Sequence, residues 1–163
     1  SYKLDFPLIA ALALHNPQWQ FVFIGPTAEG EASTDLRLWD GLSNIHCLGP
    51  REYSHLPNYC AGFQCGWLPL QRNKYTASMF PMKFFEYLSA GLPIVATRID
   101  SLEEFAAVAW LCEPQRNEFS KALKSCLRGD GPNRYQRLAI AKEHTYTARL
   151  DRMLHELKCQ ELI

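Results

Sequence analysis

The stretch from residue 80 to residue 97 limits the fold more than any other part of the chain, because it predicts a loop, a helix, a turn and a strand in succession. Pro81 suits the first helical position, where its missing N–H costs nothing, and Gly91 suits the left-handed position after the last turn. The helix is therefore expected over residues 81–90. The apolar, β-branched run 94–97 that follows is typical of a strand covered on both faces.

Two charged side chains break the pattern of this helix. Lys83 lies in the first turn, where the helix dipole disfavours a cation by about 0.3–1 kcal/mol, and Glu86 lies one turn later among apolar residues. One interpretation is a binding site, with an anion at the helix N-terminus beside Lys83 and a polyol such as ribose hydrogen-bonded to Glu86. The alternative is a surface ion pair between residues three apart, which contributes roughly 0.2–0.5 kcal/mol. Spacing alone favours neither.

The composition argues against several classes of protein. Seventeen basic and seventeen acidic side chains leave no net charge, so neither nucleic acid nor an anionic membrane is expected as the main partner. Six cysteines without CxxC or metal-ligand spacing are typical of reduced, mostly buried residues in a cytoplasmic protein. The chain also lacks the phosphate-loop, dinucleotide-binding and hydrolase motifs, which argues against those three classes of enzyme.

Helices and strands alternate along the rest of the chain. We expect strands over 20–24, 44–48, 63–69 and 108–112, helices over 6–14, 51–61 and 118–128, a loop over 70–80, and two C-terminal helices over about 133–160. Asp5 can cap the first helix, and Asp100 or Ser101 can begin a further helix with a capping box. Alternation of this kind predicts β-α-β units in a single α/β domain over 1–163, with a Rossmann-like parallel sheet and helices on both faces.

The carboxyl ends of the expected strands indicate where a ligand would bind, because open α/β sheets bind ligands beyond those ends. The residues at these ends are Gly25, Gly49, Pro50, the loop 70–80 and Thr97. The segment 70–85 has no acidic residue but carries three basic ones, Arg72, Lys74 and Lys83. A basic patch and a helix N-terminus at one rim of the sheet favour the anion site over the surface pair.

Residues 81–93 contain the motif P-x-K-x-x-E-Y-L-x-A-G-x-P, which is followed by Val95-Ala96-Thr97. This motif resembles the signature of the C-terminal, donor-binding domain of GT-B glycosyltransferases, in the group 1 (GT4-like) family. The resemblance covers most of the chain, from Asp5 to about Leu157. It implies the C-terminal half of a GT-B fold, without the N-terminal acceptor domain.

The resemblance also implies a nucleotide-sugar site and assigns its residues. Glu86 would bind the ribose hydroxyls, and Lys83 would bind the diphosphate together with the backbone around Ser78, Pro81 and Met82. Gly49, Pro50 and Arg51 would lie beside the base, Gly25 would lie close to the same crevice, and Arg72 is a further candidate for the phosphates. No catalytic residue is assigned, because part of the active site is expected in the acceptor domain.

The resemblance implies a UDP-sugar or GDP-sugar donor and no cofactor. The absence of a DxD motif is in keeping with a metal-independent site, in which the helix dipole and basic side chains stabilise the leaving diphosphate. The resemblance leans to retaining hexosyl transfer in surface polysaccharide biosynthesis, with the isolated domain inactive. The expected partners are the nucleotide sugar and the protein's own acceptor domain, in the cytoplasm, and contact of the full-length enzyme with the inner face of the membrane stays open.

Two departures from the family's sequence pattern support a second interpretation. Ser78 stands where many members of the family carry a second glutamate, eight residues before the first. Of the family's basic pair near the first strand only Lys3 is available, and the first strand, central in the order 3-2-1-4-5-6, is not found. The alternative is therefore a non-catalytic α/β scaffold or partner-binding module that retains the fold.

Overall fold

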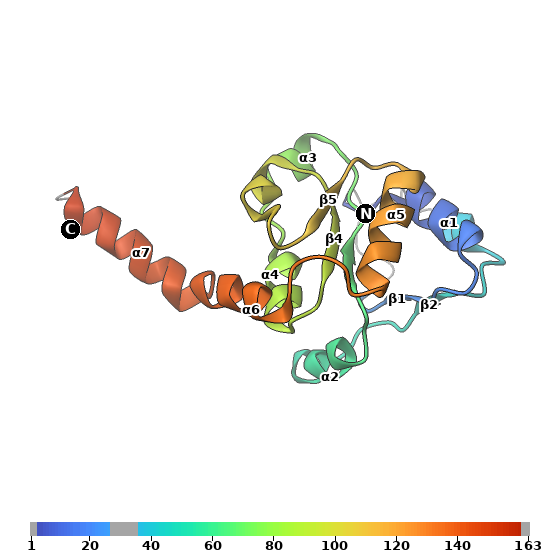
Figure 1. The fold of residues 1–163 in the computed structure, drawn as a ribbon, viewed down its shortest axis with the longest axis horizontal. Helices are drawn as coiled ribbons and strands as arrows, with labels where there is room; N and C mark the ends of the chain where they lie inside the picture. The colour runs from blue at the N-terminus through green and yellow to red at the C-terminus, as the bar shows by residue number, and fades with distance from the viewer. Residues whose placement is uncertain (1–2, 27–35, 161–163) are drawn as a thin grey trace.

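The computed structural model describes residues 3–26 and 36–160, which form parallel strands with helices on both sides (Figure 1). In chain order the elements are α1 (Phe6–His15), β1 (Phe21–Phe23), the 3₁₀-helix η1 (Leu36–Trp39), β2 (Ile45–Cys47), the 3₁₀-helix η2 (Tyr53–His55), α2 (Leu56–Ala61), β3 (Gly66–Leu68), α3 (Lys74–Ala77), α4 (Met82–Ser89), β4 (Ile94–Thr97), the 3₁₀-helix η3 (Asp100–Phe105), β5 (Trp110–Cys112), α5 (Arg116–Leu127), α6 (Arg134–Glu143) and α7 (Tyr146–Cys159). The predicted α/β, Rossmann-like fold class is confirmed.

The strands pair in parallel, but within the described residues they form two sheets where one was expected. β1 pairs with β2, and β4 lies between β3 and β5. A cavity of about 320 Å³ lies between the two sheets, and its walls include Phe21 and Val22 of β1 and Gly66 and Trp67 of β3. The order 3-2-1-4-5-6 places one more strand between these two edges, and that strand stays a prediction.

Burial of β4 builds the core. All four residues of this strand are buried, as the β-branched run predicts. Ile94 and Ala96 belong to one hydrophobic cluster with Phe84 of α4, whereas Val95 belongs to a second cluster with Phe119 of α5. Successive side chains of a strand point to opposite faces, so α4 and α5 cover the two faces of the same sheet.

The start of α4 differs from the prediction by one residue. Pro81 is the N-cap of the helix, with extended backbone at φ −76° and ψ 102°, and not its first helical residue. Proline fits there because the fixed φ is compatible with extended backbone as well as with helix. The predicted end is confirmed, because Ala90 is the C-cap and Gly91 follows with φ +73°.

Two other local predictions are wrong. The segment 70–80 is not wholly a loop, because Asn73 caps the short helix α3: its side chain accepts from the Thr76 N–H, and the Thr76 hydroxyl accepts from the Asn73 N–H. The expected capping box at Asp100 or Ser101 does not form. Ile99 is the N-cap of η3 and makes no side-chain capping bond, while the Ser101 hydroxyl donates to the Met79 carbonyl at 2.7 Å.

The two predicted C-terminal helices are present as α6 and α7. α6 packs along α4, and buried Arg137 donates two hydrogen bonds to the Gly91 carbonyl, at 3.1 and 2.8 Å. α7 extends away from the rest of the chain (Figure 1), and none of its residues is fully buried. Its apolar stripe, which includes Leu150, Met153 and Leu154, is therefore exposed.

Gly66 allows a close contact between β3 and α4. A Cβ atom at this position would lie 2.6 Å from the Cγ and Cδ2 atoms of Tyr87. We expect Gly66→Ala to lower the free energy of unfolding by about 1–3 kcal/mol, because the partly buried Tyr87 ring would have to move. Urea denaturation measures this. Gly62→Ala is the matched control, since its Cβ would come no closer than 3.5 Å to the Tyr59 carbonyl oxygen; equal losses for the two variants would contradict the explanation.

Ionisation of the Cys112 thiol is expected to lower the stability of the folded protein at alkaline pH. The described cysteines are all free, and Cys112 is buried. Burial raises the pKa of Cys112 from 9.0 to about 11, and the Glu118 carboxylate adds to this while Arg98 opposes it. The unfolded thiol therefore ionises first, so the stability present below pH 9 is lost as the pH rises towards 11, by about 1.4 kcal/mol per unit.

Chemical denaturation of the wild type and Cys112→Ala between pH 8 and 11 separates this thiol from other alkaline groups. The variant should lose stability less steeply above pH 9, because one proton no longer distinguishes the two states. Parallel pH profiles would show that Cys112 ionises equally easily in the folded and unfolded chain.

Candidate functional site

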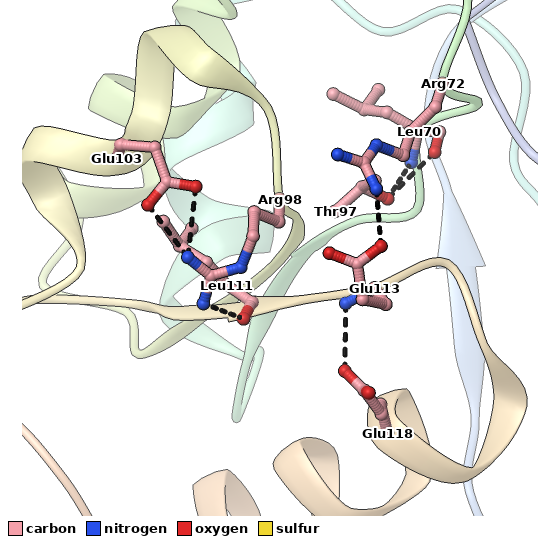
Figure 2. Close-up of polar contacts among 8 residues, drawn as sticks. All are labelled: Leu70, Arg72, Thr97, Arg98, Glu103, Leu111, Glu113 and Glu118. Carbon is pink, nitrogen blue, oxygen red and sulfur yellow. Dashed lines mark hydrogen bonds and ion pairs between the residues drawn. The ribbon is translucent and has the colours of Figure 1, made fainter.

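The carboxyl edge of the β3-β4-β5 sheet brings together charged residues from three separate segments (Figure 2). Arg72 follows β3, Arg98 follows β4 and Glu113 follows β5. Parallel pairing places the ends of the three strands at one edge, so residues more than 40 positions apart in sequence meet there. This is the edge at which the sequence predicts a ligand.

The predicted phosphate ligand Arg72 has a protein partner in this structure. Its guanidinium forms an ion pair with Glu113, and both side chains are partly exposed. The Glu113 N–H in turn donates to the Glu118 carboxylate at 2.9 Å, which ties the pair to the start of α5. Arg98 is held separately, by Glu103 and by the Leu111 carbonyl. The sequence analysis identified neither Arg98 nor Glu113 as part of this edge.

Hydrogen bonds fix the chain between β3 and α4. The buried Thr97 hydroxyl donates to the Leu70 carbonyl and accepts from the Leu70 N–H, both at 2.8 Å (Figure 2). The buried Thr76 hydroxyl donates to the Gln71 carbonyl at 2.5 Å. Ser78 lies exposed after α3, and its hydroxyl donates to the Lys74 carbonyl at 3.4 Å. The predicted phosphate-binding segment around Ser78 is thus a structured turn.

At the start of α4 the structure contains the ion pair that the sequence offered as the alternative. The Lys83 ammonium lies 2.6 Å from the Glu86 carboxylate, with the two side chains 55% and 36% exposed. Met82 is also exposed beside them, while Pro81 is buried. A pair this exposed stays accessible to a ligand, so the ion pair and the predicted binding roles are compatible.

A second group of predicted residues lies at the ends of β1 and β2. The Gly25 N–H donates to the Gly49 carbonyl at 3.1 Å, which brings these two glycines together, and Gly49 has φ +72°. Arg51 is exposed beside Pro50 and donates to the Tyr59 hydroxyl at 2.9 Å and to the Pro50 carbonyl. The four predicted residues of the base-binding region therefore form one local cluster.

The Cys60 thiol of α2 is affected by both charged residues of α4. Burial raises the pKa of this thiol, the Glu86 carboxylate raises it further, and the Lys83 ammonium lowers it. Sequence reasoning did not foresee this effect.

Two further features bear on the chemistry of this edge. Within residues 3–26 and 36–160 no group of three or more His, Cys, Asp or Glu side chains is arranged to hold a metal ion. None of the helices in these ranges is long and apolar enough to cross a membrane. The metal-independent site that the sequence suggested stays a prediction.

Comparison with known proteins shows the family. The sequence pattern of the family described as "Glycosyl transferases group 1" matches residues 4–139. TuaH of Bacillus subtilis (strain 168), named for a proposed role as a teichuronic acid biosynthesis glycosyltransferase, is 37% identical over 100 residues, which are 61% of this chain and 25% of TuaH. The chain thus spans about a quarter of that relative.

The structural comparison supports the same fold. The crystal structure of AviGT4, a glycosyltransferase involved in avilamycin A biosynthesis, matches with a TM-score of 0.53 and 17% sequence identity. The match covers 87% of this chain and 46% of AviGT4, so the chain corresponds to less than half of that protein. Because the family pattern spans most of the chain, and the fold agrees with it, the chain belongs to the group 1 glycosyltransferases of the GT-B fold.

Proposed function

We propose that this chain is the donor-binding domain of a glycosyltransferase that takes a sugar from a UDP-sugar or GDP-sugar. The observation that carries the proposal is the position of Lys83 and Glu86, exposed on the first two turns of α4 at the carboxyl edge of a parallel sheet. An ammonium beside free helix N–H groups suits a diphosphate, and a carboxylate one turn later suits the paired hydroxyls of a ribose.

The proposed binding mode uses the two groups of predicted residues. The diphosphate lies against Lys83 and the backbone from Ser78 to Met82. The ribose hydroxyls donate to Glu86, and the base lies beside Gly49, Pro50 and Arg51. In this proposal one extended nucleotide reaches both groups. Arg72 contributes to the phosphate site only if it leaves Glu113, so we assign it a secondary role.

The proposed reaction breaks the bond between the anomeric carbon of the sugar and the β-phosphate oxygen, and the diphosphate leaves with the bonding electrons. The acceptor oxygen forms the new bond, and its proton passes to the leaving diphosphate. Lys83 and the N-terminus of α4 stabilise the charge on the leaving diphosphate without a metal ion. We propose hexosyl transfer with retention, which requires the N-terminal acceptor domain. The name of the TuaH relative supports a role in surface polysaccharide biosynthesis.

The rival function is a non-catalytic module that retains the fold. Ser78 favours it, because a hydroxyl cannot replace the charge of the second glutamate found in many family members. The ion pairs of Lys83 and Arg72 with protein carboxylates also favour it, since a structural role is sufficient to explain each pair. Nucleotide binding separates the two functions.

The test is calorimetric titration of the protein with UDP, GDP, the matching nucleosides and inorganic pyrophosphate. We expect one of the two nucleotides to bind. Lys83→Met should lower the affinity for that nucleotide and for pyrophosphate about 10-fold or more, because each ligand loses a charge-assisted hydrogen bond. It should leave the affinity for the nucleoside unchanged. Glu86→Ala should weaken binding of the nucleoside. It should leave binding of pyrophosphate unchanged or tighter, because Lys83 is then released from its carboxylate partner.

The matched controls are Lys121→Met on α5 and Glu104→Ala on η3, which remove exposed side chains of the same types. All four variants should unfold within about 1 kcal/mol of the wild type, because exposed ion pairs contribute little to stability. If neither UDP nor GDP binds the folded wild type, the non-catalytic module is the better description of this domain.

A further inference from the structure

Arg149 connects the C-terminal helix to the segment that leads into α4. It lies in the first turn of α7, a helix that otherwise extends away from the domain (Figure 1). The centre of its guanidinium lies 4.3 Å from the ring centroid of Phe80 and 4.6 Å from that of Phe85. Both distances are within the range of cation–π contacts.

The burial of this guanidinium is unusual because two of its nitrogens have no hydrogen-bond partner. The Nε and Nη2 atoms of Arg149 are buried and make no hydrogen bond within the part of the chain that the structure describes. An unpartnered N–H group is costly to bury, so the two aromatic rings must offset that cost. Arg152, one turn later, instead donates to the Glu143 carbonyl at 3.2 Å and is exposed.

The two rings under Arg149 have different roles. Phe85 is buried in α4 and belongs to the core. Phe80 is 37% exposed and immediately precedes Pro81, and its ring stacks on Phe85 with centroids 5.0 Å apart. Arg149 lies against both rings, so it holds the exposed ring of Phe80 against the buried ring of Phe85. The Ser101 hydroxyl fixes the preceding residue through the Met79 carbonyl.

We propose that Arg149 is a positioning residue for the diphosphate-binding segment. By holding Phe80 on Phe85, it fixes the backbone at Pro81 to Lys83, so the N-terminus of α4 is aligned before the ligand arrives. The affinity for a nucleoside diphosphate then depends on the first turn of α7, which does not itself contact the nucleotide. The ligand part of this inference rests on the proposed function, whereas the ordering of the segment does not.

The first test is hydrogen–deuterium exchange of the ligand-free protein. Arg149→Met keeps the length of the side chain but removes the charge and the planar stack, so amide protection over residues 79–84 should fall. Arg152→Met removes the same charge from the next turn of α7 and should leave that protection unchanged. Phe80→Leu removes the ring from the other side of the contact and should reproduce the loss. Unchanged protection in both Arg149→Met and Phe80→Leu would overturn the positioning role.

The second test is titration of the same variants with the nucleoside diphosphate that binds the wild type and with its nucleoside. Arg149→Met and Phe80→Leu should each lower the affinity for the diphosphate about 3-fold to 30-fold, which is the range expected for one or two cation–π contacts. The affinity for the nucleoside should fall less than about 2-fold. The double variant should bind the diphosphate no more weakly than the weaker-binding single variant, because the two substitutions break the same contact.

The outcomes separate the two proposals. Two results would overturn the specific link to the phosphates. One is that Arg149→Met and Phe80→Leu lose as much affinity for the nucleoside as for the diphosphate. The other is that Arg152→Met loses as much affinity for the diphosphate as Arg149→Met does. Binding of neither UDP nor GDP to the wild type would overturn the donor site, and exchange protection would still decide whether Arg149 orders the segment.

Discussion

The burial of β4 on both faces is the constraint on which the rest of the structure depends. Its four residues are fully enclosed, and they pack on α4 at one face and α5 at the other. A strand buried in this way must satisfy its backbone within the sheet, so β3 and β5 pair with it on either side. The carboxyl ends of all three strands then lie at one edge, with the N-terminus of α4 beside them. The candidate site is therefore a consequence of the core.

The fold could be predicted from the sequence where the signals are local. Gly91 and Pro93 end α4, and the apolar run at 94–97 is too short and too β-branched for a helix, so the central α4-turn-β4 unit was predicted closely. Pro81 was placed one position too far inside the helix, because proline suits both the N-cap and the first turn. The helix α3 was missed because its capping depends on Asn73 and Thr76 within a segment without an apolar period.

The candidate site was only partly predictable, for a related reason. Lys83 and Glu86 could be identified because each contradicts the local pattern of its helix. The partners of Arg72 and of Arg149 could not, since Glu113 and Phe80 are far from them in sequence and meet them only through strand order and helix packing. The partners of Asn44 could not be predicted either: its side-chain amide donates to the carbonyls of Ala13, Asn16 and Trp19. Long-range pairing of this kind carries no periodic signal.

The ion pair on α4 has a consequence for how the site responds to ionic strength. An anion that binds Lys83 competes with the Glu86 carboxylate, which lies 2.6 Å from the ammonium. Added salt screens the attraction between the ammonium and the anion, but it also screens the attraction between the ammonium and its carboxylate neighbour. The two effects oppose each other in the net equilibrium. The protein thus carries an internal competitor that makes anion binding less sensitive to salt than the ligand's charge would suggest.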